Sequence, residues 1–470
     1  MKRNLILTIA VAAFMLASEF AWAADVSFSG QFRPRFIIDE DHDSTTSTAH
    51  IFDTRVRLNA KANVNANTEV FLQFQSVGNW GVANADTSGT RVSTGGGGTQ
   101  ASDALNDVGF HQAFVTLKDF AGTSFDAKIG RQEVVLDGHR LFGHTGWTTG
   151  AETKDAIRLT HSGGNHTVNL IYIAGANADS VNNSNAENEN MYVLHLNTQG
   201  VLGGSLSGYF VATNDDIGDG ADSGLPEDDQ WYTIGARQAG KLGSLDYRVE
   251  FYHQFGEASN AAERLTGYNY DATTGVDIDR EAHLFGVRVG HTFKNVPTTP
   301  TLTIWYDRLS GSDDDDITAN EYGTFDTLSD TGHKFYGFQD FFLNSSNSGT
   351  QGLGLQDLAM KMKMNPAAGW TFKADWHWFK TSVNPEGADA DTFVANNDIM
   401  AGAYDNDLGH ELDLTLAHKY DANTKIVTGY SHYWTSRTMG ELQADADDTQ
   451  HSGDASNGAH WFYIMADTKF

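Results

Sequence analysis

Apolar and polar residues alternate along many short segments of this chain. In its last eleven residues, HWFYIMADTKF, Phe462 and Ile464 share one face with the final Phe470, while Trp461 and Tyr463 share the other. An alternation with a period of two residues places successive side chains on opposite faces of a β-strand. This ending therefore predicts a strand whose two faces meet different environments.

The same alternation recurs along the whole chain and predicts an all-β protein. We count eighteen strand candidates, centred near residues 31, 58, 72, 113, 128, 158, 170, 194, 208, 235, 249, 287, 305, 358, 375, 413, 429 and 465. A soluble sandwich of two sheets would show the same period, so the period alone leaves the architecture open.

The lengths of the predicted connections separate the two architectures. Short turns lie at 65–68, 162–165, 239–244, 364–369 and 421–424. They alternate with long polar loops at about 38–50, 77–107, 134–152, 177–189, 214–229, 257–280, 310–351, 381–406 and 436–458. Short periplasmic turns and long extracellular loops are typical of a transmembrane antiparallel up-and-down β-barrel, and an even strand number leaves both termini on one side. We therefore predict such a barrel of about eighteen strands, which is wide enough to enclose water.

The N-terminus has the organisation of a secretory signal peptide. Lys2 and Arg3 precede an apolar run over residues 5–17, and Ala21-Trp22-Ala23 is a typical cleavage site. We expect residues 1–23 to be a signal peptide and residues 24–470 to form one barrel domain in the outer membrane of a Gram-negative bacterium. The chain contains no cysteine, which excludes a disulfide scaffold.

Charge is distributed unevenly along the chain, whose formal net charge is -30. Acidic residues concentrate in the predicted loops, whereas many basic residues occupy polar-face positions inside strands: Arg33, Arg35, Arg55, Arg57, Lys61, Lys128, Arg158, Arg237, Arg248, Arg288, Lys361, Lys363 and Lys373. This pattern predicts a basic lumen wall behind an acidic outer rim.

The first predicted hairpin concentrates this positive charge. If its strands pair across the loop at 38–50, Arg33 lies close to Arg55, and Arg35 lies close to Asp53 and Arg55. Like charges on facing positions destabilise a sheet, so we interpret them as a surface that contacts anions, since guanidinium binds carboxylates with two hydrogen bonds. The alternative is a ladder balanced by acids, as in a general diffusion porin without a dedicated substrate.

Catalytic and metal-binding motifs are absent from the sequence. His333, His410 and Asp340 could contribute to a barrel enzyme, but no spacing brings them together. The acidic runs at 39–43 and 313–316 are interpreted as solvated loops, with a weak divalent-ion contact as the alternative. We expect no enzyme activity, no cofactor and no bound metal.

Two aromatic segments lie near predicted strand ends, at 376–379 (WHWF) and 430–434 (YSHYW). They are interpreted as an interfacial girdle, with sugar-stacking platforms as the alternative. The final Phe470 is similar to the C-terminal aromatic signal of outer-membrane proteins, which the barrel-assembly machinery reads.

Several motifs resemble the alginate-export family of outer-membrane porins over nearly the whole mature chain. They are GRQEVVLDGHRLFG (130–143), TKDAIRL (153–159), WYDRLSGSDDDD (305–316), EYGTFDTLSDTGHKFYGFQDFF (321–342), GLQDLAMKMKM (354–364), DWHWFK (375–380) and LGHELDLTLAHKYD (408–421). The resemblance implies a monomeric barrel of eighteen strands whose arginine-rich lumen passes an anionic uronate polymer outward. It implies carboxylate contact by Arg33, Arg35, Arg55, Arg57, Arg131 and Arg158.

The inner connections depart from that family pattern. The best-known exporter closes its periplasmic mouth with a long inserted turn, whereas the inner connections predicted here are short. An open porin is therefore an alternative to gated polymer export, and the loop at 310–351 is the candidate for an occluding segment.

Together these observations predict a passive outer-membrane channel for anionic solutes, such as acidic saccharides of the alginate type. Its expected partners are those solutes or other carboxylates, outer-membrane lipid and lipopolysaccharide, and the assembly machinery, with no nucleic acid. The predicted basic wall consists of Arg33, Arg35, Arg55, Arg57, Lys61, Arg131, Arg158, Arg248, Arg288 and Lys373.

Overall fold

The computed structural model describes residues 25–40, 49–79, 108–175, 187–217, 228–258, 278–343, 349–385, 405–443 and 458–470. The predicted signal peptide and much of the long polar loops lie outside these residues. The described ranges include the centre of every predicted strand.

Nineteen strands are present in the described ranges, and eighteen of them build the barrel. They are β1 (Asp25–Glu40), β2 (Ala49–Asn63), β3 (Thr68–Asn79), β4 (Gly109–Leu117), β5 (Asp126–Gln132), β6 (Lys154–Gly163), β7 (His166–Ala174), β8 (Glu187–Val201), β9 (Gly204–Ile217), β10 (Asp228–Leu242), β11 (Leu245–Glu257), β12 (Asp279–Thr292), β13 (Thr301–Leu309), β15 (Leu355–Met364), β16 (Trp370–Lys380), β17 (Asp407–Lys419), β18 (Thr424–Thr435) and β19 (Ala459–Lys469). The remaining strand, β14 (Glu321–Tyr322), is short and pairs in parallel with the start of β12. Each of the eighteen predicted centres falls inside a barrel strand, so the predicted number is confirmed.

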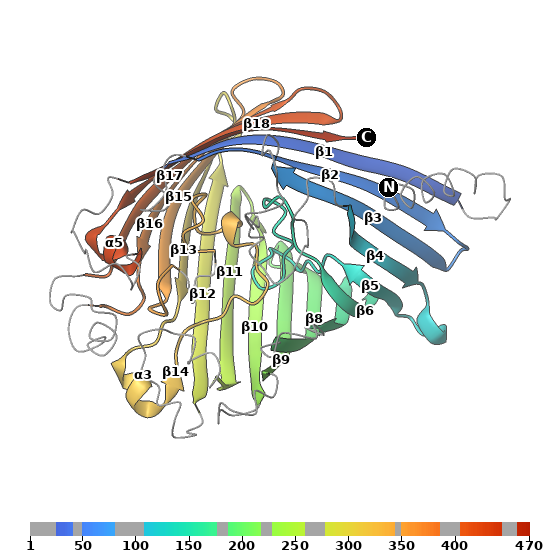
Figure 1. Cartoon of the computed structure of the whole chain (residues 1–470), viewed down its shortest axis with the longest axis horizontal. Coiled ribbons are helices and arrows are strands. Elements are labelled where there is room, and N and C mark those ends of the chain that lie inside the picture. The colour runs from blue at the N-terminus through green and yellow to red at the C-terminus, as the bar shows by residue number, and fades with distance from the viewer. Residues whose placement is uncertain are drawn as a thin grey trace, which may run out of the picture.

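The sheet closes on itself (Figure 1). Each barrel strand pairs antiparallel with its neighbours, and β1 pairs with both β2 and β19. Closure removes free sheet edges. At the seam, the backbone N–H of Gly30 donates to the Phe470 carbonyl at 2.7 Å, and the Phe470 N–H donates to the Gly30 carbonyl at 3.1 Å.

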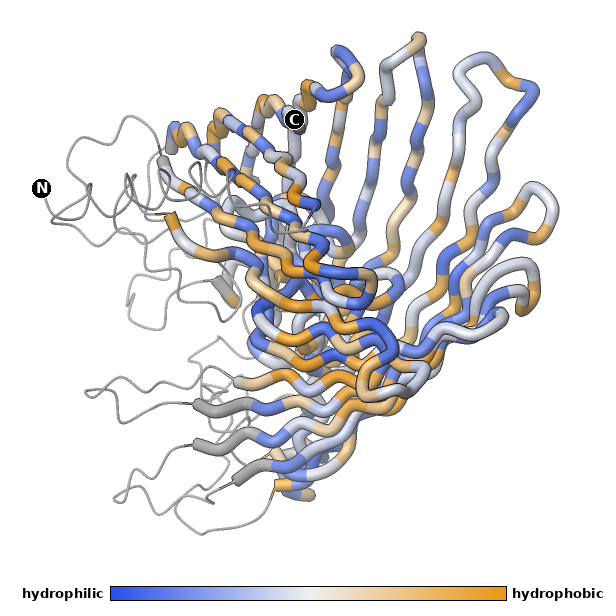
Figure 2. The backbone as a smooth tube through the Cα atoms, turned by 90° about the vertical axis from the view of Figure 1, so that its right-hand side faces the viewer, coloured by the Kyte–Doolittle hydropathy of each residue, from blue (hydrophilic) through white to orange (hydrophobic). Residues whose placement is uncertain are grey.

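Successive residues of each strand face alternately outward and into the barrel, and hydropathy alternates accordingly along the backbone in Figure 2. On β19, Tyr463 is 3% exposed and points inward, whereas Ile464 is 45% exposed on the outer face. The outer face carries exposed apolar side chains such as Phe28, Ile304 and Met360. The two environments predicted for the C-terminal strand are thus a lipid face and a lumen face.

Connections sort by length between the two ends of the barrel. One end, here called the short-turn end, has connections such as 64–67, 164–165, 243–244, 365–369 and 420–423. At the opposite, long-loop end lie α3 (Asp314–Ala319), η4 (Gly332–Lys334) and α5 (Arg437–Gln443), while η2 (Phe120–Gly122) occupies a short turn. Among the helices that the structure describes, none is long and apolar enough to cross a membrane.

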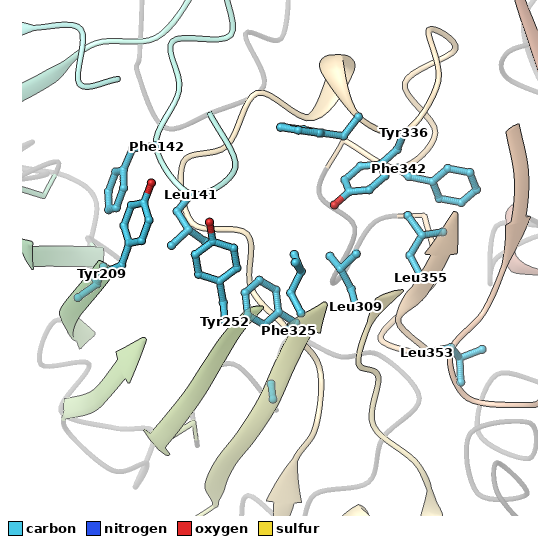
Figure 3. Close-up of a cluster of buried hydrophobic side chains, with 14 of the residues drawn as sticks. Leu141, Phe142, Tyr209, Tyr252, Leu309, Phe325, Tyr336, Phe342, Leu353 and Leu355 are labelled. Atoms are coloured by element: carbon cyan, nitrogen blue, oxygen red, sulfur yellow. The ribbon is translucent and has the colours of Figure 1, made fainter. Parts of the chain in front are cut away.

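Two segments from the long-loop end fold into the barrel. The first inward loop, residues 133–153, joins β5 to β6, and the second inward loop, described at residues 310–343 and 349–354, joins β13 to β15. Apolar side chains from both loops pack with strand residues in the cluster of Figure 3: Leu141, Phe142, Tyr209, Tyr252, Leu309, Phe325, Tyr336, Phe342, Leu353 and Leu355. The main core therefore lies inside the barrel, between these loops and the wall.

Candidate functional site

The first hairpin pairs as its sequence predicts. Arg33 faces Arg55 across β1 and β2, and Arg35 faces Asp53. The Arg35 guanidinium lies 2.5 Å from Asp53, and both side chains are buried. One acid therefore balances Arg35, while Arg33 and Arg55 face each other without an intervening carboxylate on the hairpin.

Backbone carbonyls of the first inward loop cover these two arginines. Arg33 donates to the carbonyl oxygens of Gly146 at 2.8 Å, Trp147 at 3.0 Å and Thr148 at 3.1 Å. Arg55 donates to Gly146 at 3.3 Å and Thr148 at 3.2 Å. Carbonyl dipoles thus partly offset the like charges, and the hairpin holds the loop.

The neighbouring Arg57 is also engaged. Its guanidinium donates to Gln75 at 2.7 Å, lies 2.9 Å from the His111 ring and lies 3.5 Å from Glu133. Gln75 in turn donates to the Gly150 carbonyl at 2.7 Å. The anchor of the first inward loop consequently extends to β3 and β4.

Arg140 attaches the same loop to the opposite wall. Its guanidinium contacts Glu250 on β11 at 3.0 Å and Asp307 on β13 through a charged hydrogen bond. It also donates to the Tyr336 hydroxyl at 2.5 Å and lies over the Phe335 ring at 3.8 Å. Because all of these groups are buried, loss of the arginine would leave two buried carboxylates with Arg248, at 3.2 and 3.7 Å, as the cation that they share.

Asp137 provides a third attachment. Its carboxylate lies 3.1 Å from His195 on β8 and accepts a hydrogen bond from Tyr209 on β9. Burial alone would raise the pKa of this acid, but hydrogen bonds from His195, Ser207 and Tyr209 lower its pKa to about 2. The first inward loop therefore spans the lumen, held at β1–β3, β8–β9 and β11–β13.

The second inward loop is attached to the wall by side chains that accept its backbone N–H groups. Glu411 on β17 accepts from Phe338 at 2.6 Å and Gln339 at 2.9 Å. Gln254 on β11 accepts from the Asp326 N–H at 2.9 Å and donates to its carbonyl at 2.7 Å. This segment, which the sequence analysis named as the candidate for occlusion, lies inside the barrel, and its occluding role stays a prediction.

The two inward loops also bind each other. Gly143 donates to Ser329 at 2.7 Å, Ser329 donates to Leu141 at 3.0 Å, and the Lys334 ammonium donates to Gly138 at 2.9 Å. These contacts continue as a stack in which Trp147 lies parallel to His333. The loops therefore form one partition across the interior, and no pattern in residues 134–152 had indicated that this segment belongs to it.

The basic residues predicted from strand phase all lie on inward positions, but most have a protein partner. Lys61 pairs with Glu69 at 2.7 Å and Arg288 with Asp246 at 2.9 Å. Arg158 donates to Asn169, and Arg248 lies 3.2 Å from Glu250 and over the Trp305 ring.

Arg131, which the family resemblance predicts to line the lumen, lies on the outer face of the barrel. Lys128 of the same strand faces inward over the Phe114 ring, so Arg131, three residues later, falls on the outer face. There it makes an exposed ion pair with Asp155 at 2.7 Å. The structure thus separates Arg131 from the lumen wall.

Three lysines near the short-turn end, Lys363, Lys373 and Lys425, face the lumen and are exposed to solvent. Lys363 and Lys373 face each other across β15 and β16, while the nearby Asp375 pairs with Lys361 at 3.3 Å. Within the described residues, none of the three lysines makes an ion pair.

The alternation along each strand predicts that Lys363 and Lys373 point into the lumen. The same alternation predicts an inward position for Lys425, although Lys425 is not among the basic residues named in the sequence analysis. We call these three residues the lysine cluster.

Acidic residues also line the interior, which differs from the expectation that acids gather in the loops. Asp307, Asp357, Glu411 and Asp413 lie buried on β13–β17, where Asp357 contacts His377 at 2.9 Å. The sequence pattern does not reveal them because they are scattered singly among apolar strand residues.

The three residues considered for an enzyme do not form one site. His333 and Asp340 are paired at 2.6 Å within the second inward loop. His410 lies on the outer face of β17 and packs against Trp376 and Trp434, which also contact each other.

The chain matches a known protein family over most of its length. The family model described as "Alginate export" matches residues 24–451. Among curated proteins, none matches this sequence.

Solved structures with a similar fold are outer-membrane proteins. OprD from Pseudomonas aeruginosa superposes with a TM-score of 0.55 at 11% identity, over 95% of this chain and 94% of that chain. OccK8 (OprE) from Pseudomonas aeruginosa gives a TM-score of 0.55 at 10% identity, over 95% and 98%. Acinetobacter baumannii OccAB4 gives 0.54 at 10% identity, over 95% and 98%. At these identities the likeness concerns the fold alone.

Proposed function

Because this chain belongs to the alginate-export family of outer-membrane porins, we propose that it passes anionic solutes, in particular acidic saccharides such as uronate oligomers or polymers. The protein is a β-barrel of the Gram-negative outer membrane, and its fold is that of a channel. In this orientation the short-turn end faces the periplasm. We infer the solute preference from the charges that line the lumen.

The lysine cluster is the observation that carries this proposal. Lys363, Lys373 and Lys425 present exposed ammonium groups to the lumen near the periplasmic mouth. A concave wall of one charge sign raises the local concentration of oppositely charged solutes. Because these ammonium groups are solvated, they attract a carboxylate weakly and in a salt-dependent way, as passage through a channel requires.

In this proposal the arginines of the first hairpin have a different role. The guanidinium groups of Arg33 and Arg55 donate hydrogen bonds to carbonyl oxygens of the first inward loop. They hold the partition in place, and they contribute positive potential to the lumen without being free to bind a solute. Lys61, Arg158, Arg248 and Arg288 add further positive potential while remaining bound to protein partners.

Planar-bilayer recording across a salt gradient tests the proposal. For the wild-type protein we expect a reversal potential that favours anions and a concentration-dependent block by added oligouronates. In the Lys363→Glu/Lys373→Glu/Lys425→Glu variant, we expect the reversal potential to shift toward cations and oligouronate block to weaken by at least fivefold.

Lys118→Glu/Lys294→Glu is the matched control, because these lysines lie in periplasmic turns outside the lumen strands. We expect it to keep the wild-type selectivity. Equal selectivity in all three proteins would contradict the assignment of the lysine cluster. Open channels without oligouronate block would instead favour a general diffusion porin.

A further inference from the structure

Two phenylalanines face the lumen near the short-turn end of the barrel. Phe71 on β3 and Phe114 on β4 lie opposite each other, with ring centroids 5.2 Å apart. Each lies two residues from an inward amide, since Gln73 contacts Gln112, and Gln112 accepts a hydrogen bond from the backbone of the first inward loop. Both rings remain partly exposed. We call this pair the phenylalanine platform.

The platform lies on the periplasmic side of the partition. On β3, Gln75 donates to the Gly150 carbonyl of the first inward loop and so marks the level that this loop covers. Phe71 lies on the same face of the same strand, four residues nearer to the short turn at 64–67. A solute in the periplasmic mouth therefore meets the platform before it meets the partition.

A row of hydrogen-bonded side chains borders the platform. Gln112 donates to Gln73 at 3.2 Å, and Gln73 donates to Asn59 at 2.8 Å. Asn59 is partly exposed and donates in turn to the exposed Ser29 hydroxyl at 2.9 Å. A side-chain amide has two N–H donors and an oxygen with two lone pairs, so Asn59 retains groups for a further partner. The row thus orients an amide that can bind hydroxyl groups of a solute.

Positive charge flanks the rings on both sides. Lys128 on β5 lies over the Phe114 ring at 3.8 Å. Lys61 on β2 faces Phe71 and pairs with Glu69 at 2.7 Å, while 44% of its side chain remains exposed. Because an ammonium group has three N–H donors, Lys61 can contact a second carboxylate without releasing Glu69. This part of the wall therefore combines apolar rings, an amide and positive charge.

The aromatic segments at 376–379 and 430–434, which the sequence left open as sugar-stacking platforms, do not reach the lumen in this way. Trp376 and Trp378 lie on the outer face, since His377 between them is buried inside the barrel. Trp434 also lies outside, and its inward neighbour Tyr433 is fully buried. Their position favours the interpretation as an interfacial girdle, and it leaves the phenylalanine platform as the aromatic surface that a solute can meet.

We propose that the phenylalanine platform is a saccharide subsite of the channel, an inference that rests on the proposed passage of acidic saccharides. The ring face of a sugar packs against the two phenyl rings, Asn59 binds its hydroxyl groups, and Lys61 contacts its carboxylate. Apolar surface with a few convergent polar groups is the usual composition of a small-molecule site. The subsite makes the channel prefer a sugar over a non-sugar carboxylate of equal charge. The lysine cluster cannot make this distinction, because its ammonium groups respond to charge.

Single-channel block by two polyanions of equal charge tests this inference. One is an oligouronate, and the other is an N-acetylated, C-amidated oligoglutamate with the same number of carboxylates. We expect the oligouronate to block the wild type with the longer residence time. In Phe71→Leu/Phe114→Leu, the oligouronate residence time should fall about fivefold, as the loss of an aromatic contact would cause. The oligoglutamate block and the reversal potential should stay as in the wild type.

Phe251→Leu/Phe285→Leu is the matched control. These phenylalanines also face each other across two strands, β11 and β12, but they lie on the outer face with 49% and 38% exposure. This variant should keep the wild-type residence times. If the platform double variant fails to assemble, Phe71→Leu and Asn59→Ala, each made singly, provide the comparison, and each should shorten the oligouronate residence time.

The outcomes separate this subsite from the proposed function on which it rests. Equal residence times of the two polyanions in the wild type would overturn the subsite and leave the anion preference standing, as would an unchanged oligouronate residence time in the platform variant. If the wild type showed no anion preference, the proposed function would fail. A neutral oligosaccharide that blocked the wild type for longer than it blocked the platform variant would still support the subsite.

Discussion

The indole of Trp147 and the imidazole of His333 lie parallel, with centroids 4.5 Å apart and an interplanar angle of 4°. The other face of Trp147 carries the Arg35 guanidinium at 4.4 Å, and the far side of His333 stacks on Phe338. This stack joins β1 to both inward loops. It is therefore the point at which the barrel wall, the first loop and the second loop hold one another.

Removing the indole should loosen the partition. In Trp147→Ala, the stack loses its central ring, so we expect larger and noisier single-channel steps than in the wild type. Trp370→Ala, which changes an outer-face tryptophan, is the control and should leave the steps unchanged. Identical steps in Trp147→Ala would show that the hydrogen bonds between the loops suffice.

Removing Arg140 should cost more, because it takes the closest cation from the buried Glu250 and Asp307 and leaves Arg248 to balance both carboxylates. Breaking one partner of such a buried group costs about 3–5 kcal/mol. For Arg140→Met we expect faster hydrogen exchange across residues 136–145, measured by mass spectrometry, with the barrel strands still protected.

Removing one of the two carboxylates as well tests the cause. In Arg140→Met/Asp307→Asn, the remaining Glu250 keeps Arg248 at 3.2 Å, so no buried charge is left without a partner and we expect protection of residues 136–145 to return in part. If the double variant exchanged as fast as the single one, lost packing of the arginine side chain would explain the effect better than charge.

Acid should weaken the contact between the inward loops. Burial, followed by the charges of Lys334 and His144, lowers the pKa of His139 from 6.5 to about 4, while Glu133 acts in the opposite direction. A lowered folded-state pKa means that the released chain binds the proton more tightly. The stabilising contribution is therefore complete above about pH 6.5 and is lost as the pH falls toward 4.

We expect single-channel steps to grow as the pH falls through this window. His139→Gln should flatten that response, because an amide does not titrate, whereas His166→Gln at the periplasmic end of β7 should retain it. A response that persists unchanged in His139→Gln would assign the titration to a different group, such as His144.

The seam between β1 and β19 should depend on Gly30. A Cβ at this position would lie 2.6 Å from the Phe470 ring and 2.8 Å from the Arg57 carbonyl. In Gly30→Leu we expect a smaller fraction of assembled barrel, measured as the fast-migrating form on an unheated SDS gel. Gly208→Leu is the control, since a Cβ there meets nothing within 4 Å, and equal assembly of both variants would contradict this role.

Local pattern was sufficient for the barrel itself. The period-two alternation located all eighteen strands and, in the strands that carry the predicted basic residues, the inward face as well, because a strand needs only its own residues to define two faces. It also predicted that Arg33 faces Arg55, since a hairpin pairs residues that are near in sequence. The same alternation predicts that Arg131 faces outward, because it lies three residues after the inward Lys128. Arg131 was included among the lumen residues only because of the family resemblance.

The partition across the lumen was decided by tertiary structure. Arg33 and the Gly146 carbonyl are 113 positions apart, and Arg140 and Asp307 are 167 apart. Within residues 133–153 no periodic pattern indicates that the segment folds inward, because its contacts depend on which walls the closed barrel brings within reach. Sequence by itself thus determined the strands, their number and their faces. Only the closed barrel decided which positive charges bind the protein's own loops and which remain open to a solute.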